Sequence, residues 1–202
     1  MLNRFLLPII TAGMSFLLAQ LLGCAHLPQT SAFHYISPTV RSQQAIAIER
    51  WQIEGAFSIQ SAEQSMIVHY HWNQNGKDYT IQLNSALNLV QIHITGRENQ
   101  FVQLCRSNTQ CYNAKTPELL LKQTIGWYLP ISYLKYWIRG IPLVGKAIKK
   151  YDQYGHLIFM HQNGFDLWLS HYQSFHGIDL PTRLDLKYPA FKIRLIIKQW
   201  NI

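Results

Sequence analysis

The chain has 202 residues, of which 48% are hydrophobic and 13% aromatic. This length supports one sizeable hydrophobic core and is short for two well-buried domains. Lysine and arginine number 18 against 10 aspartates and glutamates, so the net charge is +8. A basic balance favours anionic partners such as lipid headgroups, acidic protein surfaces or nucleic acid. The sequence has neither zinc-finger spacing nor an RNP-like aromatic motif, which argues against nucleic acid.

The first 23 residues have the pattern of a bacterial lipoprotein signal peptide. A positive start precedes an apolar run, and the run ends in Leu21-Leu22-Gly23-Cys24. Leucine three positions before the cysteine and a small residue directly before it fit a lipobox, although Leu22 stands where a small residue is usual. A transmembrane helix is the alternative, but the run is short and Pro8 interrupts it.

We therefore expect cleavage before Cys24 and attachment of acyl chains to this cysteine. Three acyl chains anchor a protein essentially permanently, because each buried methylene contributes about 0.8 kcal/mol. Ala25 follows in place of the aspartate that commonly retains lipoproteins in the inner membrane, so we expect the outer membrane, with the domain facing the periplasm. Residues 24–42 lack periodicity and are predicted to be a lipidated tether. Residues 43–202 are predicted to be a single domain.

Alternation of apolar and polar residues predicts antiparallel strands from Trp51 onward. In the first strand Ile53, Phe57 and Ile59 share one side. Asn75-Gly76 supplies the positive φ angles that a tight hairpin requires. The alternation predicts further strands over 66–72, 79–83, 90–94 and 101–104.

The pattern then changes to helical spacing at two places. Thr116-Pro117-Glu118 combines an N-cap hydroxyl, a first-turn proline and an acid near the positive end of the helix dipole, and Gly126 ends this helix. A second helix begins near Pro130 and stops before Pro142.

Strands resume after the helices, and the last one separates charge from apolar residues. Lys192, Arg194 and Lys198 face away from the apolar side of that strand, so this face is predicted to be basic. The later strands are predicted over 156–162, 165–172, 183–188 and 191–200. The predicted fold is mainly β with short helices: an unclosed antiparallel β-barrel of about ten or eleven strands, with the helices forming a lid over a hydrophobic cavity.

Two pairs of potential metal ligands allow several interpretations. Cys105 and Cys111 flank a short turn between strand-like runs, so a disulfide is favoured in the oxidising periplasm over free thiols or a redox or metal pair. His69 and His71 share a strand face, but no third ligand is evident and we predict no metal site.

Several pieces, in their order and spacing, resemble the LolB family of outer-membrane lipoprotein receptors over nearly the whole mature chain. They are Trp51-Gln-Ile-Glu-Gly55, Trp72-Asn-Gln-Asn-Gly76 with Tyr79, Pro117-Glu-Leu-Leu120, Gly126-Trp-Tyr-Leu-Pro130, Tyr136-Trp-Ile-Arg-Gly-Ile-Pro142, Gln162-Asn-Gly164 and Trp200. The resemblance implies an unclosed barrel with internal helices, a hydrophobic cavity, and acceptance of lipoproteins from the soluble periplasmic carrier LolA. It also implies that Leu87, on the loop between the third and fourth strands, assists deposition in the membrane. The family's usual Pro-Leu-Gly is Ala86-Leu87-Asn88 here.

The expected partners are a LolA-type carrier, acylated lipoprotein cargo and outer-membrane lipid, and the protein is expected to be a monomer. Transfer is expected without nucleotide hydrolysis or cofactors, because the sequence has no phosphate-binding Gly-rich loop. Six residues are hypothesised to line or close the acyl-chain cavity, with plain core packing as the alternative for each: Phe57, Tyr70, Trp72, Trp127, Leu129 and Trp137.

Other functional classes find less support in the sequence. An enzyme is not predicted, because there is no nucleophile elbow, no metal-binding helix motif and no cluster of carboxylates, so no catalytic residue is nominated. A lipocalin-like binder of a free lipid or other apolar ligand is the main alternative, since it would need the same cavity. A purely structural envelope lipoprotein would need no ligand. The basic face is expected to attract either an acidic carrier or anionic lipid.

Overall fold

The computed structural model describes residues 33–62, 65–85, 91–106 and 110–202. The chain divides into two units, Met1–Ala32 and Phe33–Ile202, and the described residues lie in the second. Cys24, predicted as the lipid attachment site, and Leu87, predicted as the membrane-insertion residue, lie outside the described residues.

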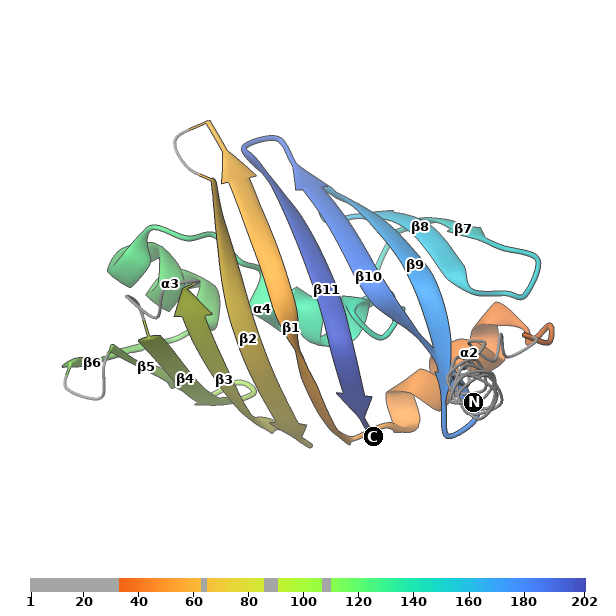
Figure 1. Cartoon of the computed structure of the whole chain (residues 1–202), viewed down its shortest axis with the longest axis horizontal. Helices are drawn as coiled ribbons and strands as arrows, with labels where there is room; N and C mark the ends of the chain where they lie inside the picture. Colours follow the sequence, from red (N-terminus) through yellow and green to blue (C-terminus); the bar gives the residue numbers. More distant parts are fainter. Residues whose placement is uncertain (1–32, 63–64, 86–90, 107–109) are drawn as a thin grey trace, which may run out of the picture. The chain divides into compact units, whose positions relative to one another are not determined.

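Eleven strands form one open antiparallel sheet in the order β6-β5-β4-β3-β2-β1-β11-β10-β9-β8-β7 (Figure 1). The first and last strands therefore pair in the middle, and the edges are β6 and β7, which follow each other in the sequence. This confirms the predicted mainly-β, unclosed antiparallel architecture. The strands are β1 (Arg50–Ser61), β2 (Ser65–Asn75), β3 (Asp78–Ser85), β4 (Gln91–Arg97), β5 (Val102–Arg106), β6 (Gln110–Ala114), β7 (Ile148–Tyr151), β8 (Leu157–Gln162), β9 (Phe165–Phe175), β10 (Ile178–Tyr188) and β11 (Phe191–Asn201).

The central pairing of β1 with β11 contains a register shift at Glu54 and Gly55. A side chain at Gly55 would collide with the carbonyl oxygen of Ile196, so the close approach requires glycine. The Tyr70 hydroxyl donates to the same carbonyl at 3.1 Å, which gives the buried phenol a partner. Glycine here thus lets the two halves of the sheet meet without an unsatisfied polar group.

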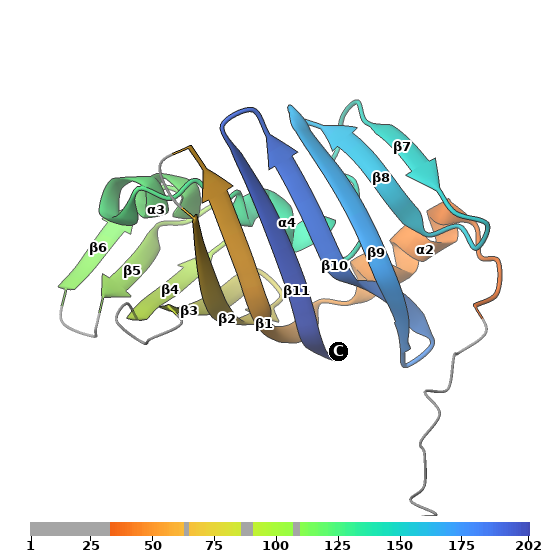
Figure 2. The same ribbon diagram turned by 45° about the horizontal axis from the view of Figure 1, so that its top comes forward.

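Two short helices lie on the inner face of the sheet, α3 (Pro117–Ile125) and α4 (Ile131–Trp137) (Figure 2). The predicted cap of α3 is present: the Thr116 hydroxyl accepts from the Leu119 amide at 3.2 Å. Gly126 ends the helix with a φ of 74°, in the left-handed region that glycine adopts readily. Local capping signals in the sequence therefore located the start and end of α3.

Two elements appear that the sequence analysis did not predict. Helix α2 (Pro38–Ala47) begins at an Ser37 N-cap, so the folded unit starts before residue 43 and includes part of the predicted tether. Strand β7 is an exposed edge strand. Its four residues, which include Lys149 and Lys150, show no alternation of buried and exposed positions. Strand β7 depends on its pairing with β8, whereas α2 begins at a local Ser37-Pro38 cap that the sequence analysis did not use.

Strands β5 and β6 are crosslinked by a disulfide. The register places Cys105 directly opposite Cys111, with their Cα atoms 4.1 Å apart, and the two sulfurs are bonded. The crosslink secures a five-residue edge strand that has exposed residues at four of its positions. The structure therefore contains the disulfide that the sequence favoured over free thiols or a redox or metal pair.

A buried polar cluster joins α2 to the far edge of the sheet. The His156 ring lies between two carboxylates, with Nδ1 2.9 Å from Asp152 and Nε2 3.1 Å from Asp179. The Arg41 guanidinium of α2 donates to Asp179 at 2.7 Å. Tyr172 stacks on the imidazole with ring centroids 4.2 Å apart. These contacts fasten the start of the domain to β9 and β10.

The cluster should make stability depend on pH. Burial alone would raise the pKa of Asp179, but hydrogen bonds from His156 and Arg41 outweigh it and hold the pKa below its ordinary value. Such a carboxylate contributes stability above its unfolded pKa of about 3.9, and this stability is lost as the pH falls through the lower folded pKa. Urea unfolding at a series of pH values should show Asp179→Asn reducing the free energy of unfolding by about 1–3 kcal/mol at neutral pH and flattening the acid loss. An unchanged acid profile in the variant would contradict this assignment.

Candidate functional site

The inner face of the sheet is apolar and buried from β5 across to β8, and α3 and α4 pack on it. Leu120 and Leu121 of α3 and Leu134 of α4 are fully buried against it. Among the described residues, the buried polar or charged side chains are Gln74, Arg139, His156 and Gln162. An interior of this composition suits alkyl chains, because it presents few groups that need hydrogen bonds.

The six residues hypothesised to form the cavity are all buried, each no more than 6% exposed. Phe57 brings two of the others together: its ring centroid lies 6.1 Å from Tyr70 and 6.3 Å, edge to face, from Trp127. Trp72 lies elsewhere, against Trp51 at 5.3 Å. The fifth, Leu129, is buried in the link between α3 and α4. The structure therefore gathers half of the predicted set into one group.

Trp137, the sixth predicted residue, is fully buried and held by polar contacts. Its indole N–H donates to the Gln162 side-chain oxygen at 3.3 Å, and Gln162 also bonds the backbone N–H and carbonyl of Leu143 at 2.9 Å each. The indole ring packs edge to face on Phe165 at 5.3 Å. This arrangement favours a core role for Trp137 over a mobile cavity wall.

An aromatic rim that sequence reasoning missed closes the space where the α3–α4 link meets β9, β10 and β11. Tyr128 stacks on Tyr188 at 6.1 Å and is 43% exposed. Burial raises the pKa of the Tyr128 hydroxyl above its ordinary value. The sequence held a signal for the rim, because aromatic residues flank the turns at 163–164 and 189–190. The rim consists of Tyr128, Tyr133, Phe165, Tyr188 and Phe191, in contact pairwise.

A hollow of about 190 Å³ lies at the start of α3 and α4, beside β2 and β3. Trp72 and Tyr79 line it together with Ile131, and Trp72 is the one member of the predicted set on its surface. The Trp72 N–H donates to the Gln74 side-chain oxygen at 3.2 Å, which fixes the indole plane. The hollow thus marks a place where the cover over the inner face is incomplete.

Few polar contacts hold α3 in place, whereas α4 has several. Glu118 of α3 accepts from the Ser132 backbone N–H at 2.7 Å, and so joins the two helices. Lys135 of α4 forms an ion pair with Glu98 at 3.0 Å, and Tyr136 donates to the same carboxylate at 3.1 Å. The hydrogen bond from Lys135 lowers the pKa of Glu98, which therefore remains ionised at neutral pH. The Glu98–Lys135 pair is partly buried, with the two side chains 36% and 15% exposed.

Arg139 is a buried cation without a carboxylate among the described residues. It donates to the backbone carbonyls of Ala45 and Ile48 at 2.9 Å and to that of Lys135 at 3.1 Å. Burial lowers its pKa to about 10, so the guanidinium is still charged at neutral pH. Arg139 thus ties the end of α4 to the end of α2 and serves the fold.

The described part of the chain has no group of three or more histidine, cysteine or acidic side chains placed to hold a metal ion. Across the same ranges, each helix is too short or too polar to cross a membrane.

Comparison with known proteins gives a consistent result. Residues 49–200 match the family model described as outer membrane lipoprotein LolB. An outer-membrane lipoprotein LolB of Coxiella burnetii is 38% identical over 183 residues, covering 89% of this chain and 87% of the relative. One of Pseudomonas paraeruginosa is 33% identical over 189 residues, covering 91% and 92%.

Similarity to solved structures supports the fold. A LolA superfamily protein from Nitrosomonas europaea matches with a TM-score of 0.53 and 9% identity, covering 83% of this chain and 94% of the other. A DUF1329 family protein from Desulfovibrio piger matches with a TM-score of 0.52 and 10% identity, covering 81% and 90%.

Replacing a side chain by alanine should change the free energy of unfolding less in the aromatic rim than in the core. Trp137→Ala should reduce the free energy of unfolding by about 3–5 kcal/mol, because it empties a fully buried site. Tyr128→Ala should cost less than about 1 kcal/mol, because the ring is partly exposed, while it admits an apolar dye to the interior. Urea unfolding and dye fluorescence measure the two effects. If Tyr128→Ala lost as much stability as Trp137→Ala, the rim would be core.

Proposed function

Because this chain belongs to the LolB family of outer-membrane lipoproteins, we propose that it accepts acylated lipoproteins from a LolA-type periplasmic carrier and inserts them into the outer membrane. The observation that carries the proposal is the apolar inner face, which is covered by two short helices, of which α3 has few polar contacts with the rest of the domain. The acyl chains of the cargo would occupy the space beneath α3 and α4. The protein would act as a receptor rather than as an enzyme.

The physics of the cargo explains why such a space is needed. Each methylene exposed to water costs about 0.8 kcal/mol, so three acyl chains cannot cross the periplasm unsheltered. The sequence has no nucleotide-binding loop, and transfer therefore has to run downhill in free energy. The receptor would bind cargo more tightly than the carrier does. The bilayer would in turn hold cargo more favourably than the receptor does.

Acyl chains can enter only if side chains that now fill the interior move. Leu120 and Leu121 of α3 pack against the sheet where a chain would lie. Displacing α3 breaks its contacts with Ser132 and exposes apolar surface, whereas the paired backbone of the sheet stays intact. An entering alkyl chain replaces the lost apolar contacts, so the open state is stabilised by the cargo itself.

The domain would be held at the membrane by acyl chains on Cys24, with Leu87 assisting release into the bilayer. Ser85 and Gln91 flank residues 86–90, and β3 runs toward the same end of the sheet as β1 and β10. This is the end at which the aromatic rim lies. Release beside the rim would give the chains a short path from the interior to lipid.

Cargo transfer tests the proposal directly. A tagged acylated lipoprotein bound to its LolA-type carrier is mixed with this protein, and liposomes are added afterwards. We expect the cargo to move to the protein and then to lipid without added nucleotide. If the cargo stays on the carrier while the protein binds free fatty acid, the lipocalin-like function replaces the receptor function.

Leu87→Glu should slow the second step by about tenfold or more, because a carboxylate is expensive to place among acyl chains. Capture of cargo from the carrier should be unchanged. Leu87→Met keeps an apolar tip and Val40→Glu adds the same charge to exposed α2, so both controls should deliver normally. Normal delivery by a folded Leu87→Glu protein would remove this residue from the mechanism.

A further inference from the structure

The outer face of the sheet carries a cluster of aromatic and basic side chains at the end of the strands marked by the turns 163–164 and 189–190. The helices lie on the opposite face, so no described element covers this cluster (Figure 2). Cross-strand register places its members in two adjacent rows, which we call the outer patch. The rows are Lys150, Phe159, Trp168, Asp185 and Arg194, and Ile148, His161, Asp166, Lys187 and Lys192.

Trp168 is the centre of the outer patch. It is 42% exposed, whereas the other five of the chain's six tryptophans are buried. Its ring lies 5.5 Å from Phe159, and the Lys150 amine lies 5.6 Å from the centre of that second ring. Trp168 also borders a hollow of about 300 Å³ that Lys192 and Arg194 line. A large aromatic in water beside cations is typical of a surface that meets a partner.

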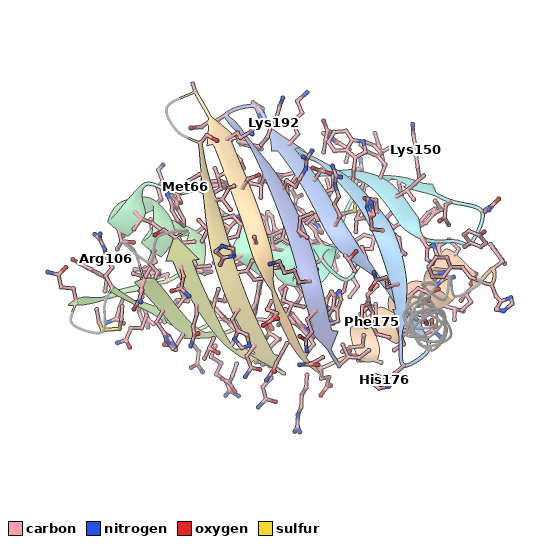
Figure 3. All side chains as sticks on the ribbon, in the orientation of Figure 1. Met66, Arg106, Lys150, Phe175, His176 and Lys192 are labelled. Atoms are coloured by element: carbon pink, nitrogen blue, oxygen red, sulfur yellow. A yellow bond between two sulfur atoms is a disulfide. The ribbon has the colours of Figure 1, made fainter. Side chains whose placement is uncertain are left out.

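The charges of the outer patch are unbalanced. Asp185 already pairs with Arg183 at 2.7 Å and with Arg194 at 2.6 Å. Asp166 lies 2.7 Å from His161. Within the described ranges, the amines of Lys150, Lys187 and Lys192 have no ion-pair partner, and two of them are labelled where they project from the sheet in Figure 3. The patch therefore presents excess positive charge to an anionic partner.

We propose that the outer patch binds the anionic headgroups of a phospholipid bilayer and lays the domain on the membrane surface. Tryptophan and lysine are the residues that settle at the headgroup level, the ring because it is amphipathic and the amine because it meets phosphate. Exposed Ile148 adds apolar surface beside them. The proposal rests on the proposed function only in assuming that a bilayer is within reach.

The orientation has a consequence for delivery. Lys187 and Lys192 flank the turn at 189–190, and Tyr188 and Phe191 of the aromatic rim are their chain neighbours on the inner face. A bilayer bound by these lysines lies next to the rim. The outer patch thus brings the edge of the apolar interior to the lipid surface.

Trp168 is a built-in reporter for this contact. The full lipid-anchored chain is reconstituted in vesicles of brominated phosphatidylcholine, with or without phosphatidylglycerol, in the absence of carrier and cargo. With phosphatidylglycerol, we expect the Trp168 emission to be quenched by bromine and protected from acrylamide in the water. In phosphatidylcholine alone it should remain open to acrylamide. Trp168→Phe identifies which part of the emission belongs to this residue.

Charge variants decide whether the outer patch itself makes the contact. Lys187→Gln with Lys192→Gln should reduce the ratio of docked to undocked protein about 25-fold, since each lysine near an anionic surface contributes about fivefold. The matched pair Lys115→Gln with Lys122→Gln removes the same charge from other exposed sites and should change little. Equal losses in both pairs, or equal acrylamide access in the two kinds of vesicle, would overturn the proposal.

A protein partner is the remaining outcome that the design detects. If Trp168 stays open on anionic vesicles and becomes protected only when the carrier is added, the outer patch binds protein and the lipid proposal is wrong. Flotation with phosphatidylcholine vesicles tests the Cys24 anchor separately. Because carrier and cargo are absent from the vesicle measurement, its failure leaves the transfer function standing, and a failure of transfer leaves lipid docking standing.

Discussion

An eleven-stranded sheet with one apolar face must keep that face from water, and the other features of the domain follow from this constraint. Each large apolar side chain left exposed would forfeit about 1.5–3 kcal/mol of burial. The sheet bends around its inner face but does not close, and β6 and β7 remain as separate edges. The chain between these two edges has to supply the missing cover, and it does so as α3 and α4.

Different parts of the domain provide its stability and the cover over its inner face. The pairing of β1 with β11 and the His156 cluster hold the sheet and its ends with buried contacts. Helix α3 is held mainly by apolar packing, whereas α4 is also tied by the hydrogen bond from Trp137 to Gln162 and, at its end, by Arg139. A domain built in this way can lose its cover locally without losing its sheet. A receptor for acyl chains needs that separation, since its interior must open and remain folded.

The two faces of the sheet have opposite chemistry because side chains alternate along every strand. In β11 the inward residues are apolar and buried, while Lys192, Arg194 and Lys198 are exposed on the other side. The inner face suits the acyl chains of cargo, and the basic outer face suits the anionic surface to which cargo is delivered. One strand therefore contributes to both proposed contacts.

Alternation and capping in the sequence were enough to determine most strands, the cap and end of α3 and the sign of the outer face, because these depend on residues close in the chain. The same analysis did not predict α2, although Ser37-Pro38 is a local cap, and it missed β7, which is ordered by its pairing with β8. The sequence identified aromatic residues that are buried. It could not distinguish Trp137, which is hydrogen-bonded to Gln162 in the core, from Phe57, which lies beside Trp127. Tertiary structure alone decided which of these side chains meet, and it placed the aromatic rim and Trp168, because strand register and helix docking join residues that are distant in sequence.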